Sequence, residues 1–274
     1  MKQLIVVADW ALDSISCQEI KSAVNGFLQG QENLNISFVN VTPSTIHTGF
    51  VLNQIVEIEE RLGRPMETVI FQNTDPRLES TTGVKEARGA EFIIIKLLSG
   101  IYICGPNAGY NFSFIKSKID QIYLYPNFSS GTQFRSRDLY SRVCAHLIEE
   151  MEDKMELEET HTNTIPEIRG MYVGHIDNYG NIKTTQKHDY FVGKFELQDM
   201  ITIEMNGITK KARYVSNLFG GNVGELVIYP GSFGPKENPY LEITIWRHFT
   251  EKKSITGLAE FNNPKIGEEI KITQ

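Results

Sequence analysis

The first half of the chain alternates short apolar runs with segments whose apolar residues recur every three or four positions. The apolar runs fall at residues 4–8, 36–41, 69–71, 92–98 and 101–104. Such runs are typical of strands that are covered on both faces. Helical spacing between the first three runs predicts one helix with Ile15, Ile20 and Val24 on a common face and a second at 46–62, closed by Gly63.

The last two apolar runs flank Gly100, which predicts a hairpin, and residues 138–150 have the pattern of a final helix. We therefore expect an α/β N-terminal domain, with a layered β-α-β sheet and helices on both of its faces.

The pattern changes after Gly170, where the helical period disappears. Four short apolar segments follow, separated by turn sequences rich in Asn and Gly, at 171–176, 200–205, 225–229 and 241–245. Strands of this length and spacing are typical of antiparallel sheets. The second domain should be a smaller all-β barrel or sandwich.

An acidic segment separates the two patterns. Residues 149–160 contain seven Asp and Glu side chains against Lys154 alone, and Pro166 follows. We expect a solvated helix end and connector here, although such a run also suits a cation or a partner protein. The predicted boundaries are an α/β domain at 1–157, a linker at 158–169 and an all-β domain at 170–274.

Composition narrows the function classes. The formal net charge of −7 gives no basic field for nucleic acid, so no nucleic-acid partner is expected. Three scattered cysteines without a C-x-x-C pair favour neither a disulfide framework nor a zinc site and fit a reducing cytoplasm. The N-terminal apolar run is too short for a signal peptide or a membrane span, so no membrane partner is expected.

Two acidic residues follow predicted strands of the first domain. Asp9 comes directly after the first strand, where a carboxylate can accept hydrogen bonds from two ribose hydroxyls or can serve as a cap or turn acid. Asp75 stands in Asn-Thr-Asp-Pro after the third strand, where the proline allows an outward-pointing carboxylate but the position taken alone favours a turn role. For Asp9, position alone leaves both alternatives open.

Three loops offer further polar groups. Asn107 lies in Gly-Pro-Asn-Ala-Gly, a tight turn after a strand. The segment 134–138 reads Phe-Arg-Ser-Arg-Asp before a helix and could hold an anion or a water molecule, or simply cap the helix. The segment 177–181 reads Asp-Asn-Tyr-Gly-Asn and offers polar edges and a stacking ring, or an ordinary hairpin turn. The dinucleotide, P-loop, hydrolase-elbow and zincin motifs do not occur.

Taken in order, these motifs resemble the S-adenosyl-L-methionine hydroxide adenosyltransferases, a family homologous to the fluorinase and chlorinase. The resemblance extends over nearly the whole chain and is strongest at 134–147 and 176–181. It rests on an Asp after the first strand, Thr-Pro before the second helix, Asp-Pro after the third strand, Gly-Pro-Asn-x-Gly, Phe-x-Ser-Arg-Asp before Val-x-Ala-His-Leu, Ile-Asp-x-Tyr-Gly-Asn, Gly-Glu-Leu, and Gly-Ser before Leu-Glu-Ile.

The resemblance implies an enzyme that cleaves S-adenosyl-L-methionine at C5′ with water, giving adenosine and L-methionine. It implies a homotrimer with interfacial sites, with S-adenosyl-L-methionine as substrate and no cofactor or metal. The resemblance implies that Asp9 binds the ribose, that Tyr179 and Asn181 contact the face and the edge of the adenine, and that Asp177 and Ser232 bind the ammonium and the carboxylate of the methionine. It implies further substrate contacts for Asn107 and Phe134. In the catalytic set, Asp75 would orient the water, together with Arg88, Arg135 and Ser136.

The chain departs from the family pattern at the water-handling residues. Arg-Leu-Glu follows Asp75-Pro76 where hydrolases have glycines, and Arg88 stands later than the family arginine. Arg135 occupies the place of a family histidine, Ser136 that of a glycine, and Asp13 is one residue early relative to the family's second acid. An arginine cannot act as a base at neutral pH, so the missing histidine and the altered glycine turn leave open an adenosyl-binding protein without turnover. Ser136 also permits a halide-dependent adenosyl transferase, although the Asp75 carboxylate would repel a halide at short range.

Overall fold

The structure is a computed structural model that describes residues 1–30, 33–76, 90–126, 133–247 and 255–273. It divides into two compact units, Met1–Ile168 and Arg169–Gln274, and each is considered by itself.

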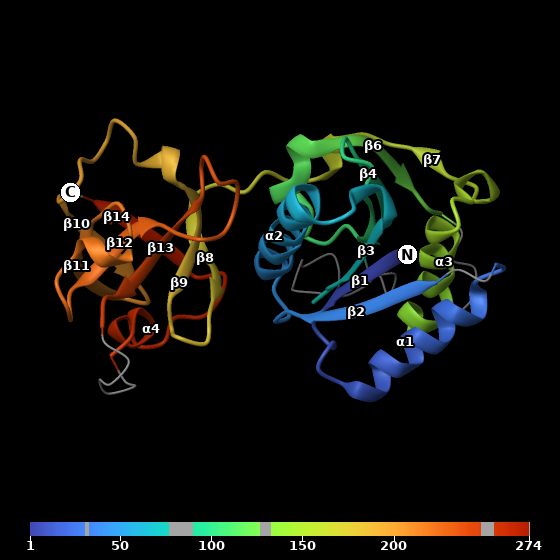
Figure 1. The fold of residues 1–274 in the computed structure, drawn as a ribbon, viewed down its shortest axis with the longest axis horizontal. Coiled ribbons are helices and arrows are strands. Elements are labelled where there is room, and N and C mark those ends of the chain that lie inside the picture. Colours follow the sequence, from blue (N-terminus) through green and yellow to red (C-terminus); the bar gives the residue numbers. More distant parts are fainter. Residues whose placement is uncertain (31–32, 77–89, 127–132, 248–254, 274) are drawn as a thin grey trace. The chain divides into compact units, whose positions relative to one another are not determined.

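The first unit is built on a mixed seven-stranded sheet in the order β2-β1-β3-β5-β4-β6-β7 (Figure 1). Its parallel part contains β1 (Lys2–Ala8), β2 (Leu34–Asn40), β3 (Thr68–Asn73) and β5 (Tyr102–Pro106). The antiparallel part contains β4 (Phe92–Leu97), β6 (Ile119–Leu124) and β7 (Glu158–Glu159). The predicted hairpin is confirmed, because β4 and β5 are antiparallel and Gly100 between them has φ +89°. A φ in this range favours glycine.

Helices pack against both faces of this sheet. On β1, Leu4, Val6 and Ala8 belong to one apolar cluster with residues of α1 (Ser14–Phe27) and α3 (Ser141–Ile148). The alternate residues Ile5 and Val7 belong to a second cluster with residues of α2 (Thr45–Leu62). The period-2 alternation of a strand places successive side chains on opposite faces, so a continuously apolar strand serves both layers.

One prediction for α1 is wrong. Ile20 and Val24 are fully buried, but Ile15 is 70% exposed. Ile15 and Ile20 are five positions apart, which is about 140° around a helix, so the two side chains do not share a face. The helix begins after Asp13, whose Oδ1 accepts the Ile15 N–H at 3.1 Å.

The predicted helix at 138–150 begins earlier and ends earlier than expected. A π-helical turn, Ser136–Tyr140, leads directly into α3 (Ser141–Ile148), and the Ser141 N–H donates to the Ser136 carbonyl. The predicted linker at 158–169 is also corrected, since β7 within it pairs with β6 and the first unit extends to Ile168. The end of the acidic segment, Glu158–Glu159, is therefore part of the sheet of the first unit.

The second unit is a closed seven-stranded barrel in the order β10-β11-β12-β13-β9-β8-β14, which resolves the predicted choice between barrel and sandwich (Figure 1). Its elements are β8 (Met171–Ile176), β9 (Ile182–Lys187), β10 (Met200–Met205), β11 (Ile208–Tyr214), β12 (Leu226–Pro230), β13 (Tyr240–Ile245), α4 (Gly257–Glu260) and β14 (Glu269–Thr273). The β11–β12 pair is parallel and the other neighbours are antiparallel. Phe191, Phe261 and Ile243 lie in its fully buried core.

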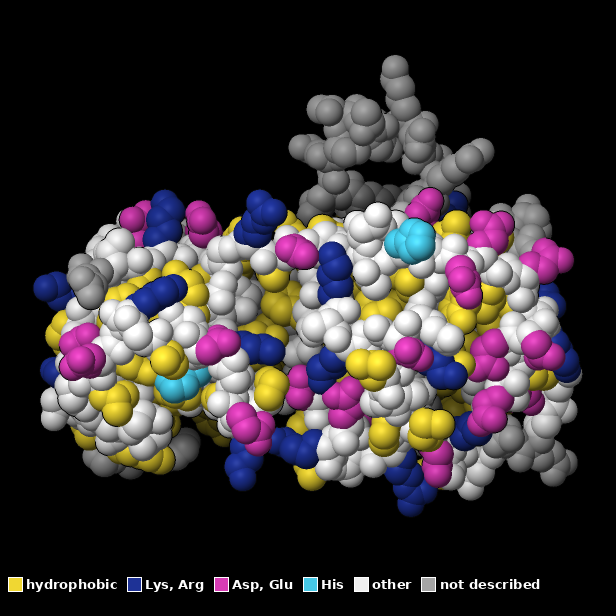
Figure 2. All heavy atoms as spheres, turned by 90° about the horizontal axis from the view of Figure 1, so that it is seen from above, with side chains coloured by type: hydrophobic (Ala, Val, Ile, Leu, Met, Phe, Trp, Pro, Cys, Tyr) yellow, Lys and Arg dark blue, Asp and Glu magenta, His cyan; other side chains and the backbone are white. Residues whose placement is uncertain are grey.

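The surface and the helices add two observations. On the face drawn in Figure 2, acidic and basic side chains are interspersed rather than gathered by sign. Among the described residues, no helix is both long and apolar enough to cross a membrane.

Candidate functional site

Two of the expected acidic residues lie at one edge of the first unit's sheet. Asp9 directly follows β1 and Asp75 comes two residues after β3. These strands are parallel neighbours, with Ala8 in register with Asn73, so both carboxylates emerge at the carboxyl end of the same strand pair. Ligands of open α/β sheets bind at such ends.

The Asp9 carboxylate has a raised pKa. Burial raises the pKa of Asp9, the backbone N–H groups of Asp9 and Trp10 lower it, and the charge of Asp75 raises it further. Asp75 is also anchored, because its Oδ2 accepts the Ala90 N–H at 3.0 Å. Asp75 therefore does more than precede Pro76 in a turn. It holds the backbone at the start of the segment that leads to β4.

Phe134 and Ser136 reach this edge from the turn before α3. The Phe134 ring packs edge-on against Trp10, which follows Asp9, with ring centroids 5.7 Å apart. The Asn73 side-chain amide donates to the buried Ser136 hydroxyl. Asn73 was not singled out by the sequence, because only its place at the end of β3 marks it. The indole N–H of Trp10 is buried and has no partner among the described residues.

The remaining expected residues of the first unit are placed differently. Arg135 lies at the start of the π-helical turn and is partly buried. Asn107 follows β5, but its recorded bonds join it to the carbonyls of Thr164 and Glu91 rather than to Asp9 or Asp75. Arg88 lies outside the described residues.

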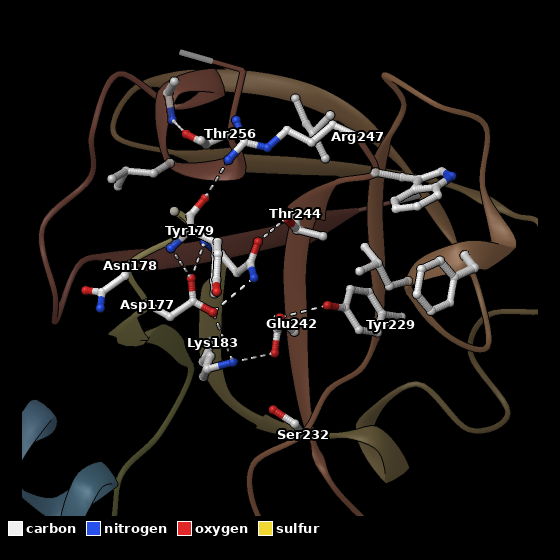
Figure 3. Close-up of a pocket in the computed structure, with 18 of the residues that line it drawn as sticks. Asp177, Asn178, Tyr179, Lys183, Tyr229, Ser232, Glu242, Thr244, Arg247 and Thr256 are labelled. Atoms are coloured by element: carbon white, nitrogen blue, oxygen red, sulfur yellow. Dashed lines mark hydrogen bonds and ion pairs between the residues drawn. The ribbon is translucent and has the colours of Figure 1, made fainter. Parts of the chain in front are cut away.

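The barrel contains a pocket of about 1240 Å³, and all four expected residues of the second unit line it: Asp177, Tyr179, Asn181 and Ser232 (Figure 3). The first three belong to the turn between β8 and β9, and Ser232 follows β12. The segment 177–181 is thus both a hairpin turn and part of a pocket wall.

Asp177 organises this turn. Its Oδ1 accepts the backbone N–H groups of Tyr179 at 2.9 Å and Asn181 at 3.1 Å, and its Oδ2 accepts the Asn181 side-chain amide at 2.9 Å. Gly180 has φ +77°, and a Cβ there would lie 2.7 Å from Thr256 Cβ. The Tyr179 ring is 60% exposed and offers a flat apolar face at the pocket.

A buried charged group lies beside the turn. Lys183 Nζ is 2.6 Å from Glu242 Oε2 and 3.6 Å from Asp177 Oδ2 (Figure 3). Tyr229 donates its hydroxyl to Glu242 Oε1 at 2.7 Å, and burial with the Glu242 charge raises the pKa of Tyr229 well above its usual range. Lys183 lies over the Phe233 ring, 4.6 Å from its centroid. Two carboxylates thus face one ammonium, which leaves this end of the pocket acidic.

Sequence reasoning did not single out these residues for any role. Lys183, Tyr229, Glu242 and Thr244 come from β9, β12 and β13, which pair side by side. The pocket also contains an aromatic pair, Phe219 and Trp246, with centroids 4.9 Å apart and perpendicular planes. One sequence signal could have pointed to the buried charges: Glu242 lies between apolar residues of a strand, in Leu-Glu-Ile. Among the described residues, no group of three or more His, Cys, Asp and Glu side chains could hold a metal ion.

Comparisons with known proteins support the fold alone. No protein-family model and no curated protein sequence matches the chain. Among solved structures, an uncharacterized conserved protein from Thermotoga maritima matches 98% of this chain and all of its own, with 19% identity and a TM-score of 0.71. A conserved hypothetical protein from Thermus thermophilus matches all of both chains, with 17% identity and a TM-score of 0.64. The two-unit architecture is therefore shared with these proteins.

Proposed function

We propose that the chain is an S-adenosyl-L-methionine hydrolase that gives adenosine and L-methionine. One observation carries the proposal: Asp177, Tyr179, Asn181 and Ser232, the residues to which the family resemblance assigns adenine and methionine contacts, line a single pocket. Sequence spacing alone does not require Ser232 to meet the β8–β9 turn.

The chemistry of the pocket fits a cationic amino-acid conjugate of a nucleoside. Its acidic end holds two carboxylates against one ammonium and favours a positively charged ligand. The exposed Tyr179 ring suits stacking on a purine, and the Ser232 hydroxyl can donate to a carboxylate.

In this proposal, the sheet edge of the first unit binds the ribose of S-adenosyl-L-methionine and its C5′ atom, where the reaction takes place. Asp9 accepts the ribose hydroxyls, and Asp75 orients a water molecule toward C5′. The water oxygen forms a bond to C5′ as the C5′–S bond breaks, and the electron pair stays on sulfur, which becomes a neutral thioether. The water proton passes through Asp75 to solvent. Because a sulfonium is a good leaving group, positioning and exclusion of bulk water supply most of the catalysis.

We further propose a homotrimer in which the barrel pocket of one subunit meets the Asp9–Asp75 edge of its neighbour. The support is that the expected site residues are divided between the two units of the chain.

Product analysis in ¹⁸O-labelled water tests the reaction. Incubation with S-adenosyl-L-methionine should yield adenosine with ¹⁸O in its 5′-hydroxyl and an equal amount of methionine. Unlabelled adenosine would show that the hydroxyl oxygen does not come from water. Boiled protein and the Asp75→Asn variant are the controls, and added chloride tests for a 5′-chloro product.

A second candidate is an adenosyl-binding protein without turnover. The observation that favours it is Arg135 in place of the family histidine, since a guanidinium cannot take a proton from water at neutral pH. Saturable binding of S-adenosyl-L-methionine with no product after long incubation would select this function.

A further inference from the structure

The Asn181 side-chain amide is held from both ends. Its Nδ2 donates to Asp177 Oδ2 at 2.9 Å, and its Oδ1 accepts the hydroxyl of the buried Thr244. Asn181 itself is only partly buried and lines the pocket. The amide is therefore both fixed and accessible to a ligand.

Asp177 determines which end of the amide is which. The two ends of an amide are nearly equal in shape, so only hydrogen-bond partners distinguish them. An ionised carboxylate accepts hydrogen bonds and cannot donate, whereas the Thr244 hydroxyl can do either. Asp177 is itself fixed by the N–H groups of Tyr179 and Asn181, and its Oδ2 forms an ion pair with the Lys183 ammonium at 3.6 Å. The NH₂ end must face Asp177.

The fixed amide keeps one donor and one acceptor for a ligand. An amide has two N–H groups and two oxygen lone pairs, and Asp177 and Thr244 use one of each. Among the described residues, no other group is recorded as a partner of the Asn181 side chain. The remaining donor and acceptor have an order that cannot be reversed without losing the bond to Asp177.

We propose that Asp177 locks the Asn181 amide in one orientation and so restricts the pocket to 6-aminopurine nucleosides. This inference rests on the proposed adenosyl site. Adenine presents its 6-amino donor beside a ring-nitrogen acceptor, whereas hypoxanthine presents a 6-oxo acceptor beside an N1–H donor. A mobile amide turns over and pairs with either base, but a locked amide pairs with adenine and opposes hypoxanthine with like groups.

The order of three affinities measured by calorimetry on the full chain tests the lock. The ligands are adenosine, inosine and nebularine, which lacks a substituent at C6. If the amide is locked, adenosine binds most tightly, nebularine more weakly and inosine most weakly, with an affinity for inosine roughly 10- to 100-fold below that for adenosine. If the amide is mobile, adenosine and inosine bind with equal affinity and nebularine binds more weakly than both. That result would overturn the inference without contradicting the proposed adenosyl site. Failure of all three to bind at millimolar concentration would overturn both.

Variants assign the lock to Asp177. Asp177→Asn keeps the size of the side chain but can donate as well as accept, so inosine should rise above nebularine. The exposed Asp189 outside the pocket provides the matched control Asp189→Asn, which should keep the wild-type order. An unchanged order in Asp177→Asn would refute the role of Asp177. If that variant does not fold, Asn181→Leu tests the amide itself, since it should reduce the three affinities to within a few-fold of one another.

Discussion

Lys183 and Glu242 stand directly opposite each other on β9 and β13, with Nζ and Oε2 2.6 Å apart and each side chain only 6% exposed. A buried ion pair is stable only while both partners remain, because the surviving charge would otherwise be left without compensation in a poorly solvated place.

Lys183→Met should therefore lower the free energy of unfolding by about 3–5 kcal/mol, as expected when one partner of a buried pair is removed. Lys183→Met combined with Glu242→Gln should recover part of this loss, because glutamine still accepts the Tyr229 hydroxyl without a charge. Urea denaturation of the wild type and both variants measures the difference. Equal midpoints for the wild type and the single variant would contradict a stabilising pair.

Asp9→Ala should weaken adenosine binding by about 1.5–3 kcal/mol, the range for hydrogen bonds to a charged group. The matched control is Asp13→Ala, four residues further along, because Asp13 is exposed and caps α1. That control should lower the melting temperature while leaving the affinity unchanged. Calorimetric titration of both variants decides the matter, and equal affinities in wild type and Asp9→Ala would remove Asp9 from the site.

Asp75→Asn should reduce the turnover rate by about 10²–10⁴ while substrate affinity is kept, as for the loss of a positioned acid–base group. Asparagine retains an oxygen that can accept the Ala90 N–H, so the backbone anchor survives. Single-turnover kinetics with separately measured binding tests this. Equal chemical rates would show that the carboxylate serves only the backbone.

The raised pKa of Asp9 predicts a pH-dependent stability difference. The folded state binds the Asp9 proton more tightly than the unfolded state, so this group's contribution to stability is greatest below the ordinary aspartate pKa of 3.8 and falls as pH rises through the raised folded value. Asp9→Asn removes this loss. The variant should be more stable than the wild type at neutral pH, with the difference vanishing in acid. Denaturation midpoints across the acid range measure it, and a difference independent of pH would be inconsistent with the raised pKa.

A homotrimer is expected in solution at micromolar concentration, because the proposed site needs residues from two units that meet across a subunit boundary. Light scattering gives the mass directly. A monomer that is still active would contradict the predicted homotrimer, because one chain alone would then hold the complete site.

The sequence predicted those strands and turns that are determined by residues close to one another in the chain. Buried parallel strands show as continuous apolar runs, and Gly180 within Asn-Tyr-Gly-Asn is an ordinary turn signal. Three barrel strands, β9, β11 and β14, escaped prediction because each mixes lysines or threonines with its apolar residues and so lacks a clear apolar run.

The missed part of the pocket depends on contacts between distant residues. A lysine in a strand normally faces solvent, and Lys183 is buried only because closure of the barrel brings Glu242, 59 residues later, against it. The orientation of the Asn181 amide likewise depends on Thr244 from β13. Such pairings are set by tertiary structure and have no counterpart in local periodicity.

The π-helical turn at 136–140 gives the first unit a point where its helix can change by one residue. A π turn holds one residue more than an α-helical turn, so removing a residue there would restore regular winding. Each residue of an α-helix turns the chain by about 100°, and such a deletion would swing Phe134 away from Trp10 while Val143 and Leu147 keep their places in the core. An insertion or deletion in this turn would therefore change the direction of Phe134 relative to α3.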